Sequence, residues 1–169
     1  RPYRKTGNHI LLCCQRNGGW SMKGIAVPDW IVNIVRKIKR YTDRPIVIRP
    51  HPGDKHAYRN IRMIKHQLKT KHRISTNRNI VTDLDNAWAT VTYNSSPSVV
   101  SAIEGVPVFV TDPEPKTSQA YEVANIDLSK IESPVEYDRL EWVRKLAMCH
   151  WNKNELQSGK AWKHFKDAI

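Results

Sequence analysis

The fold is decided by residues 88–110, which read WATVTYNSSPSVVSAIEGVPVFV. Residues 88–93 are rich in the β-branched and aromatic side chains that fill buried strands, and residues 106–110 form a second such run. Between them, residues 97–104 have the length of a short helix that opens at a proline, and Gly105 supplies the stop expected at a helix C-terminus. The stretch therefore predicts a strand, a helix and a strand in succession, the repeating unit of a parallel α/β sheet.

The same alternation extends toward the N-terminus. An apolar run at residues 9–14 ends in turn residues, and residues 45–49 form a second β-branched run. Residues 28–41 show the 3.6-residue spacing of an amphipathic helix, and residues 54–68 are expected to form another, with Asp54 as its N-cap. Two strands and their crossover helices are thus predicted upstream of residue 70.

The downstream half is patterned less clearly. Residues 70–79 give only a weak strand, and a helical region is expected from residue 134 onward with a break at Ser158-Gly159. We expect an α/β fold, with a Rossmann-like three-layer domain and a mainly parallel sheet over residues 1–133. Residues 134–169 are expected to form a C-terminal helical extension packed on it.

The composition is that of an ordinary globular protein, with 40% hydrophobic and 26% charged residues. No apolar run approaches the roughly 20 residues that span a bilayer, so we expect no transmembrane segment. Cys13 and Cys14 are adjacent in an expected strand and point to opposite faces, which argues against a disulfide framework and places the protein in a reducing cytoplasm. No Cys-x-x-Cys or His-Glu-x-x-His motif predicts a metal site.

The formal net charge of +12 is concentrated in one region. From Arg36 to Arg78 there are 14 Lys and Arg residues and only two acids, Asp43 and Asp54, while the rest of the chain is balanced. The basic residues form either a solvated helix face or a surface for the phosphates of a nucleotide, a nucleic acid or an anionic glycan.

A candidate phosphate site lies in the loop that follows residues 88–93. Ligands of open parallel sheets bind at the carboxyl ends of the strands, where loops lead into helices. The loop Asn94-Ser95-Ser96-Pro97-Ser98 offers hydroxyls, backbone N–H groups and a helix N-terminus to one anion. The competing interpretation is an ordinary serine cap in front of Pro97.

A second candidate loop, Arg49-Pro50-His51-Pro52-Gly53, follows residues 45–49. The flanking prolines hold His51 with little conformational freedom, and an imidazole N–H can stabilise the charge of a departing phosphate. His51 is therefore the candidate catalytic residue, and Arg49 is expected to add positive charge. Taken alone, His51 has an equally ordinary interpretation as a surface turn residue, but its pairing with the serine loop favours a functional role.

Three motifs together carry a family resemblance. Arg49-Pro50-His51-Pro52, Ser95-Ser96 and residues 102–108 (AIEGVPV) resemble the C-terminal, donor-binding half of GT-B glycosyltransferases. The most similar branch has His-Pro and Ser-Ser motifs and includes bacterial sialyltransferases, Kdo transferases and teichoic-acid glycerophosphotransferases. The resemblance implies one half of a GT-B fold in which His51, Ser95 and Ser96 hold the phosphates of a nucleotide sugar.

The resemblance also implies an activity. It predicts a glycosyltransferase, with no cofactor beyond a CMP-, CDP- or UDP-linked donor substrate and with a glycan or a modified DNA base as acceptor. We expect this transfer to be independent of a metal ion. Many UDP-sugar members place a ribose-binding Glu at the position of Val100, and Glu104 does not inherit that role. GT-B enzymes keep the acceptor site in an N-terminal domain, which we expect to lie outside this chain, so that the chain alone binds donor without transferring.

The full set of expected donor contacts extends beyond the two motifs. Gln15, Gly18 and Gly19 in the first loop, where glycine permits close backbone approach, are candidate loop contacts. Asp112 and Glu114 follow the last strand, where family members touch the donor sugar, although a solvated acidic turn is the alternative. The expected nucleotide and phosphate contacts are Arg49, His51, Pro52, Asn94, Ser95, Ser96 and Ser98.

Two other functions fit parts of the sequence. Residues 36–78 are basic enough for a nucleic-acid-binding module without catalysis, although only Tyr41 and Tyr58 supply aromatic rings there. A UDP-sugar 2-epimerase-like domain shares the Gly-x-Pro-Val ending at residues 105–108, but the sequence assigns it no acidic catalytic residues.

Overall fold

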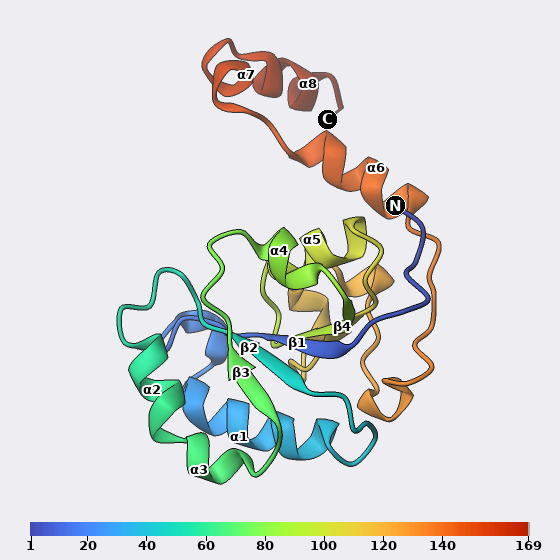
Figure 1. Ribbon diagram of the computed structural model, residues 1–169. Coiled ribbons are helices and arrows are strands. Elements are labelled where there is room, and N and C mark those ends of the chain that lie inside the picture. Colours follow the sequence, from blue (N-terminus) through green and yellow to red (C-terminus); the bar gives the residue numbers. More distant parts are fainter. Residues whose placement is uncertain (169) are drawn as a thin grey trace. The chain divides into compact units, whose positions relative to one another are not determined.

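The chain folds around a five-stranded parallel sheet. The computed structural model describes residues 1–168, with side chains to residue 166, and it divides into two compact units, residues 1–137 and a second beginning at Asp138. The strand order is β3-β2-β1-β4-β5, and every pair is parallel (Figure 1). The strands are β1 (His9–Cys13), β2 (Ile46–Arg49), β3 (His72–Ile74), β4 (Ala87–Thr92) and β5 (Val108–Val110).

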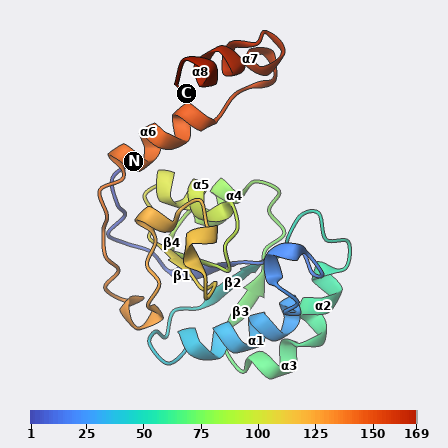
Figure 2. The ribbon, with the colours of Figure 1, turned by 180° about the vertical axis from the view of Figure 1, so that it is seen from behind.

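Helices cover both faces of this sheet, as Figures 1 and 2 show from opposite sides. One face carries α1 (Val27–Ile38), α2 (Ala57–Met63) and α3 (Lys65–Leu68), and the other carries α4 (Ile80–Leu84) and α5 (Pro97–Ile103). The expected α/β fold, Rossmann-like with three layers and a parallel sheet, is confirmed.

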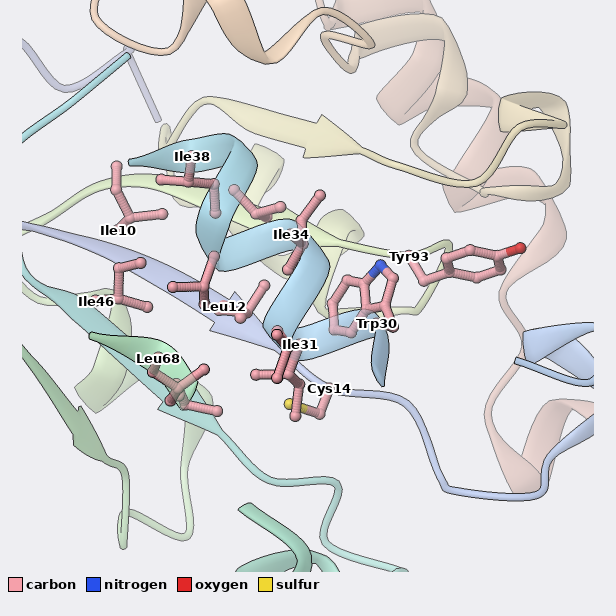
Figure 3. Close-up of a cluster of buried hydrophobic side chains, with 14 of the residues drawn as sticks. Ile10, Leu12, Cys14, Trp30, Ile31, Ile34, Ile38, Ile46, Leu68 and Tyr93 are labelled. Carbon is pink, nitrogen blue, oxygen red and sulfur yellow. The ribbon is translucent and has the colours of Figure 1, made fainter. Parts of the chain in front are cut away.

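The core between α1 and the sheet follows directly from the sequence pattern. Ile31, Ile34 and Ile38 of α1 point toward Ile10 and Leu12 of β1, and all five side chains are at most 4% exposed (Figure 3). Burying one such side chain stabilises a fold by about 1.5–3 kcal/mol. This packing holds α1 against the sheet and so positions the loop that joins it to β1.

The indole of Trp30 ties α1 to the end of β4. It meets the ring of Tyr93 edge to face, with centroids 6.3 Å apart and planes at 87°, and its Nε1–H donates a 3.1 Å hydrogen bond to Oγ1 of Thr111. The loops after β1, β4 and β5 are therefore anchored near the same point.

The helix expected over residues 54–68 is two helices. At Ile64 the backbone has φ −94° and ψ 1°, which ends α2 and starts α3. The apolar spacing survives the break because Ile61, Ile64 and Leu68 all remain in the core. Asp54 is not the N-cap, since its carboxylate accepts from the backbone N–H of His56 before the helix begins at Ala57.

The weak strand expected over residues 70–79 is β3, the outermost strand beside β2. After β5 the chain forms three short 3-10 helices, η2 (Pro115–Thr117), η3 (Tyr121–Val123) and η4 (Leu128–Lys130). Asn125 returns to pair with Phe109 of β5 in an isolated bridge. This return holds the segment after β5 against the edge of the sheet.

The second unit is helical, as expected. It contains α6 (Leu140–Cys149), α7 (Lys153–Gln157) and α8 (Lys160–Ala168), and the expected break falls at Ser158-Gly159, where Gly159 has φ +75°. The packing of this extension on the first unit stays a prediction. Within residues 1–168, no helix has the length and apolar character to cross a membrane.

Candidate phosphate-binding site

A pocket of about 580 Å³ lies at the carboxyl edge of the sheet, which is within the range of sites that hold drug-sized ligands. It is bounded by the loops that follow β1, β2 and β4 and by the segment after β5. The strand order reverses between β1 and β4, and this switch point is where open α/β sheets bind their ligands. The lining includes Gln15, His51, Asn94, Ser95, Ser96 and Thr117.

His51 is oriented by its own loop. The backbone N–H of Gly53 donates a 3.0 Å hydrogen bond to Nδ1 of His51, so that nitrogen carries no proton and the neutral ring keeps its proton on Nε2. The bond closes a tight turn between two prolines, which cannot themselves donate. His51 is therefore held as a hydrogen-bond donor through Nε2, in a ring that lines the pocket.

The hydroxyls of Ser95 and Ser96 do not cap the helix that follows them. Ser96 occupies the N-cap position of α5 without a side-chain capping bond, and the buried Oγ of Ser95 has no hydrogen-bond partner among the described residues. Ser96 therefore occupies the cap position in front of Pro97 that the ordinary interpretation expects, but its hydroxyl does not form the capping bond. Leaving a buried hydroxyl without a partner costs about 1–3 kcal/mol of stability.

Ser98 has a structural role instead. Its side chain is fully buried, and its Oγ donates a 2.7 Å hydrogen bond to the carbonyl of Ser95. This bond holds the Ser95 backbone in the turn that opens α5. The backbone N–H groups of Ser95 and Ser96 donate to no backbone carbonyl in the part of the chain that is described, so they also remain available to an anion.

Arg49 lines the pocket, but its guanidinium is already bound by other groups of the protein. It forms a buried ion pair with Asp83 and donates 2.9 Å hydrogen bonds to the carbonyls of Asn77 and Arg78. Asp83 also accepts from Ser75 and from Asn77, each at 2.7 Å. Arg49 therefore ties the loop after β3 to the His51 loop, and we assign it a positioning role in place of the free charge that the sequence suggested.

Asn94 and Asp112 form a hydrogen-bond network that links the loops after β1, β4 and β5. Nδ2 of Asn94 donates to a carboxylate oxygen of Asp112 at 2.7 Å, and its Oδ1 accepts from Gln15. Asp112 also accepts from Lys23 at 3.1 Å and from Thr117 at 2.7 Å. Burial raises the pKa of the Asp112 carboxyl, but these hydrogen bonds and one from the Glu114 N–H outweigh it and lower that pKa below its usual value. The Asp112 carboxyl is thus ionised near neutral pH and holds the surrounding loops together.

Two cysteines also line the pocket. Burial raises the pKa of Cys13 to about 12 and raises that of Cys14 well above its usual value. Because the thiolate is the nucleophilic form, neither side chain offers a nucleophile to a bound substrate near neutral pH.

The structure thus brings most of the expected site residues together. Five of the expected residues do not line the pocket. Two of them, Gly18 and Gly19, lie farther along the loop after β1. The other three form hydrogen bonds that support the pocket or lie in the turn after β5, and they are Ser98, Asp112 and Glu114. The expected contacts that do line it are Gln15, Arg49, His51, Pro52, Asn94, Ser95 and Ser96.

Sequence reasoning missed Ile80, Thr117 and Gln119, which also line the pocket. Thr117 and Gln119 lie in the segment after β5, and the only signal for them was that a fifth strand must deliver its loop to the same edge. Val100 lines the pocket where many UDP-sugar enzymes carry a ribose-binding Glu, while Glu104 pairs with Arg1 at 2.7 Å.

No group of three or more His, Cys, Asp or Glu side chains within residues 1–168 is arranged to hold a metal ion. Comparison with protein-family models, with curated proteins and with solved structures gives no match for the chain. The class that fold and pocket define is a Rossmann-like domain with a pocket of ligand size at its switch point.

Proposed function

We propose that this pocket binds the phosphates of a nucleotide sugar and that the chain is the donor-binding half of a metal-independent glycosyltransferase. The observation that carries the proposal is the pairing of two unused donors in one pocket. Among the described residues, neither Nε2–H of His51 nor the buried Oγ of Ser95 has a hydrogen-bond partner, while the atoms that orient the two residues are satisfied. Donors arranged in this way match an anion with several acceptor oxygens better than an apolar ligand.

The proposed chemistry is stabilisation of the leaving group. When the bond between the sugar and the phosphate breaks, negative charge develops on the phosphate oxygens, and donors already aimed at those oxygens lower the barrier. His51 supplies the N–H of its Nε2 as a donor, and the loop of Ser95 and Ser96 supplies hydroxyls and backbone N–H groups. In this proposal the second half of the cleft, with the acceptor and its base, comes from another domain.

The proposal is tested by calorimetric titration of CMP-, CDP-, UDP- and GDP-linked sugars into the protein. One donor is expected to bind, and His51→Ala is expected to weaken its binding by about tenfold or more, as befits a lost hydrogen bond to a charged group. The matched control is His66→Ala, because His66 is an exposed histidine on α3 that does not line the pocket. Absence of binding by every donor to the folded protein, or equal losses in the two variants, would overturn the proposal.

A further inference from the structure

The basic residues between positions 36 and 78 form an exposed surface on one side of the first unit. Eleven of their side chains are exposed, and they come from the end of α1 and the residues after it, from the loop before α2, from α2 and α3, and from the segments before, within and after β3. We call this set the basic surface. Its members are Arg36, Lys37, Arg40, Lys55, Arg59, Arg62, Lys65, Lys69, Lys71, Arg73 and Arg78.

These elements lie next to one another. α1 contacts α3, both pack on the same face of the sheet, and β3 is the outermost strand on that side (Figures 1 and 2). The apolar side chains of α2 and α3 turn inward, with Ile61 and Leu68 at most 4% exposed. The cations of the two helices must therefore project outward, away from the core.

The protein itself does not neutralise this surface. None of the eleven side chains forms an ion pair with a carboxylate in the described part of the chain, whereas the neighbouring Arg44 is paired with Glu132 and Arg49 with Asp83. The only acids in the same stretch are Asp43 and Asp54, and Asp54 accepts from two backbone N–H groups. Unscreened like charges destabilise a fold, so the concentration of positive charge points to an anionic partner.

We propose that the basic surface binds a nucleic-acid duplex through its phosphate backbone. Six of the eleven cations are arginines, whose planar guanidinium matches the paired oxygens of a phosphate. The aromatic rings that stack on single-stranded bases are scarce, since only Tyr41 and Tyr58 are present and the hydroxyl of Tyr58 donates to the Ser75 carbonyl. Met63 is the one other large apolar side chain exposed in this stretch, which is too few for insertion into a lipid surface.

The dimensions agree with a backbone contact. From Ala57 to Leu68, α2, Ile64 and α3 span 12 residues, which corresponds to about 18 Å if the helices run end to end, and a duplex strand carries one phosphate per roughly 3.4 Å of axis. About five phosphates of one strand therefore lie within reach. Lys55 lies in the same loop as His51 and Arg78 adjoins that loop, but none of the eleven residues lines the pocket, so the inference stands independently of the proposed nucleotide-sugar site.

The experiment measures fluorescence anisotropy of a labelled DNA duplex of about 20 base pairs as the full chain is added at several salt concentrations. Two triple variants are compared with the unmodified protein. Arg59→Glu, Arg62→Glu and Lys65→Glu alter the basic surface, whereas Lys130→Glu, Lys153→Glu and Lys160→Glu alter exposed lysines elsewhere. Both triple variants have the same net charge, so any difference between them arises from position.

The unmodified protein is expected to bind at low salt, with an affinity that falls steeply as salt is added. The α2–α3 variant is expected to bind about tenfold more weakly or worse and to show a smaller salt slope, by about 0.9 for each lost phosphate contact, while the control variant keeps the slope. Thermal unfolding establishes that both variants are folded.

Three results would overturn the inference. Absence of duplex binding at low salt would show that a duplex is not the partner of the basic surface. Equal weakening of binding in both variants would mean that only the net charge of the protein matters. Stronger binding to single-stranded DNA, or to phosphatidylserine vesicles, than to the duplex would identify a different partner.

Discussion

The backbone N–H of Gly53 donates to Nδ1 of His51 over 3.0 Å, and this bond decides which nitrogen of the ring faces a ligand with a proton. A methyl group on Gly53 would lie 3.2 Å from Cε1 and 3.3 Å from Nδ1 of that ring, closer than ordinary packing permits. The position of the His51 ring therefore depends on glycine two residues later.

Gly53→Ala is accordingly expected to displace the His51 ring without unfolding the protein. Nucleotide binding is expected to weaken by about fivefold, equivalent to a hydrogen bond of ~1 kcal/mol. Calorimetry measures the affinity and thermal unfolding checks the fold. An unchanged affinity in the folded variant would show that the Gly53 contact does not control the donor.

Ser95→Ala is expected to affect nucleotide binding, whereas Ser98→Ala is expected to affect stability. The Ser95 hydroxyl has no hydrogen-bond partner within the described residues, so its removal is expected to leave the free energy of unfolding unchanged or slightly higher and to weaken nucleotide binding. The Ser98 hydroxyl donates to the Ser95 carbonyl, so its removal is expected to lower the free energy of unfolding by about 1 kcal/mol.

Urea unfolding and nucleotide titration of the two variants separate these effects. The two serines are close in sequence and differ only in what their hydroxyls contact. A loss of stability in Ser95→Ala of the size expected for Ser98→Ala would contradict the assignment of Ser95 to a ligand.

The sequence predicts the central strands well, but it predicts the edge strand β3 and the break between α2 and α3 poorly. Residues 10–14 form a continuous apolar run and residues 88–93 are rich in β-branched and aromatic side chains, which favours buried central strands for both. β3 is harder to detect because it is an edge strand of three residues with Arg73 in the middle, so neither length nor alternation marks it. The break at Ile64 is invisible for the opposite reason, since the apolar spacing continues through it.

The sequence predicts those parts of the candidate site whose features lie within a single loop. His51 between its prolines and the pair Ser95-Ser96 are local features, and both line the pocket. The partners of Arg49 and Asn94 are not local, because Asp83 lies 34 positions away from the first and Asp112 lies 18 positions from the second. A charged side chain beside a motif is easily taken for a ligand contact until its partner is known.

The ionised state of Asp112 predicts a pH dependence of stability. Because the folded-state pKa of this carboxyl is lowered, its contribution is fully present above the pKa of the unfolded chain, about 3.9, and is lost as the pH falls through the folded-state pKa. Asp112→Asn lacks this contribution at every pH.

The difference in the free energy of unfolding between the unmodified protein and Asp112→Asn is therefore expected to be largest at neutral pH. It should narrow once the pH falls below about 4. Urea unfolding across the acidic range measures it, and a difference that stays constant with pH would mean that the carboxylate charge is not what Lys23 and Asn94 recognise.

The central claim is that the pocket recognises phosphate, and a comparison of each nucleoside diphosphate with its own nucleoside tests it most directly. Calorimetry of the cytidine, uridine and guanosine pairs on the unmodified protein isolates the contribution of the phosphates, because each pair shares its base and ribose. We expect one diphosphate to bind at least about tenfold more tightly than its nucleoside. We also expect that difference to disappear in His51→Ala. Equal affinities within every pair, or no binding at all, would contradict the account.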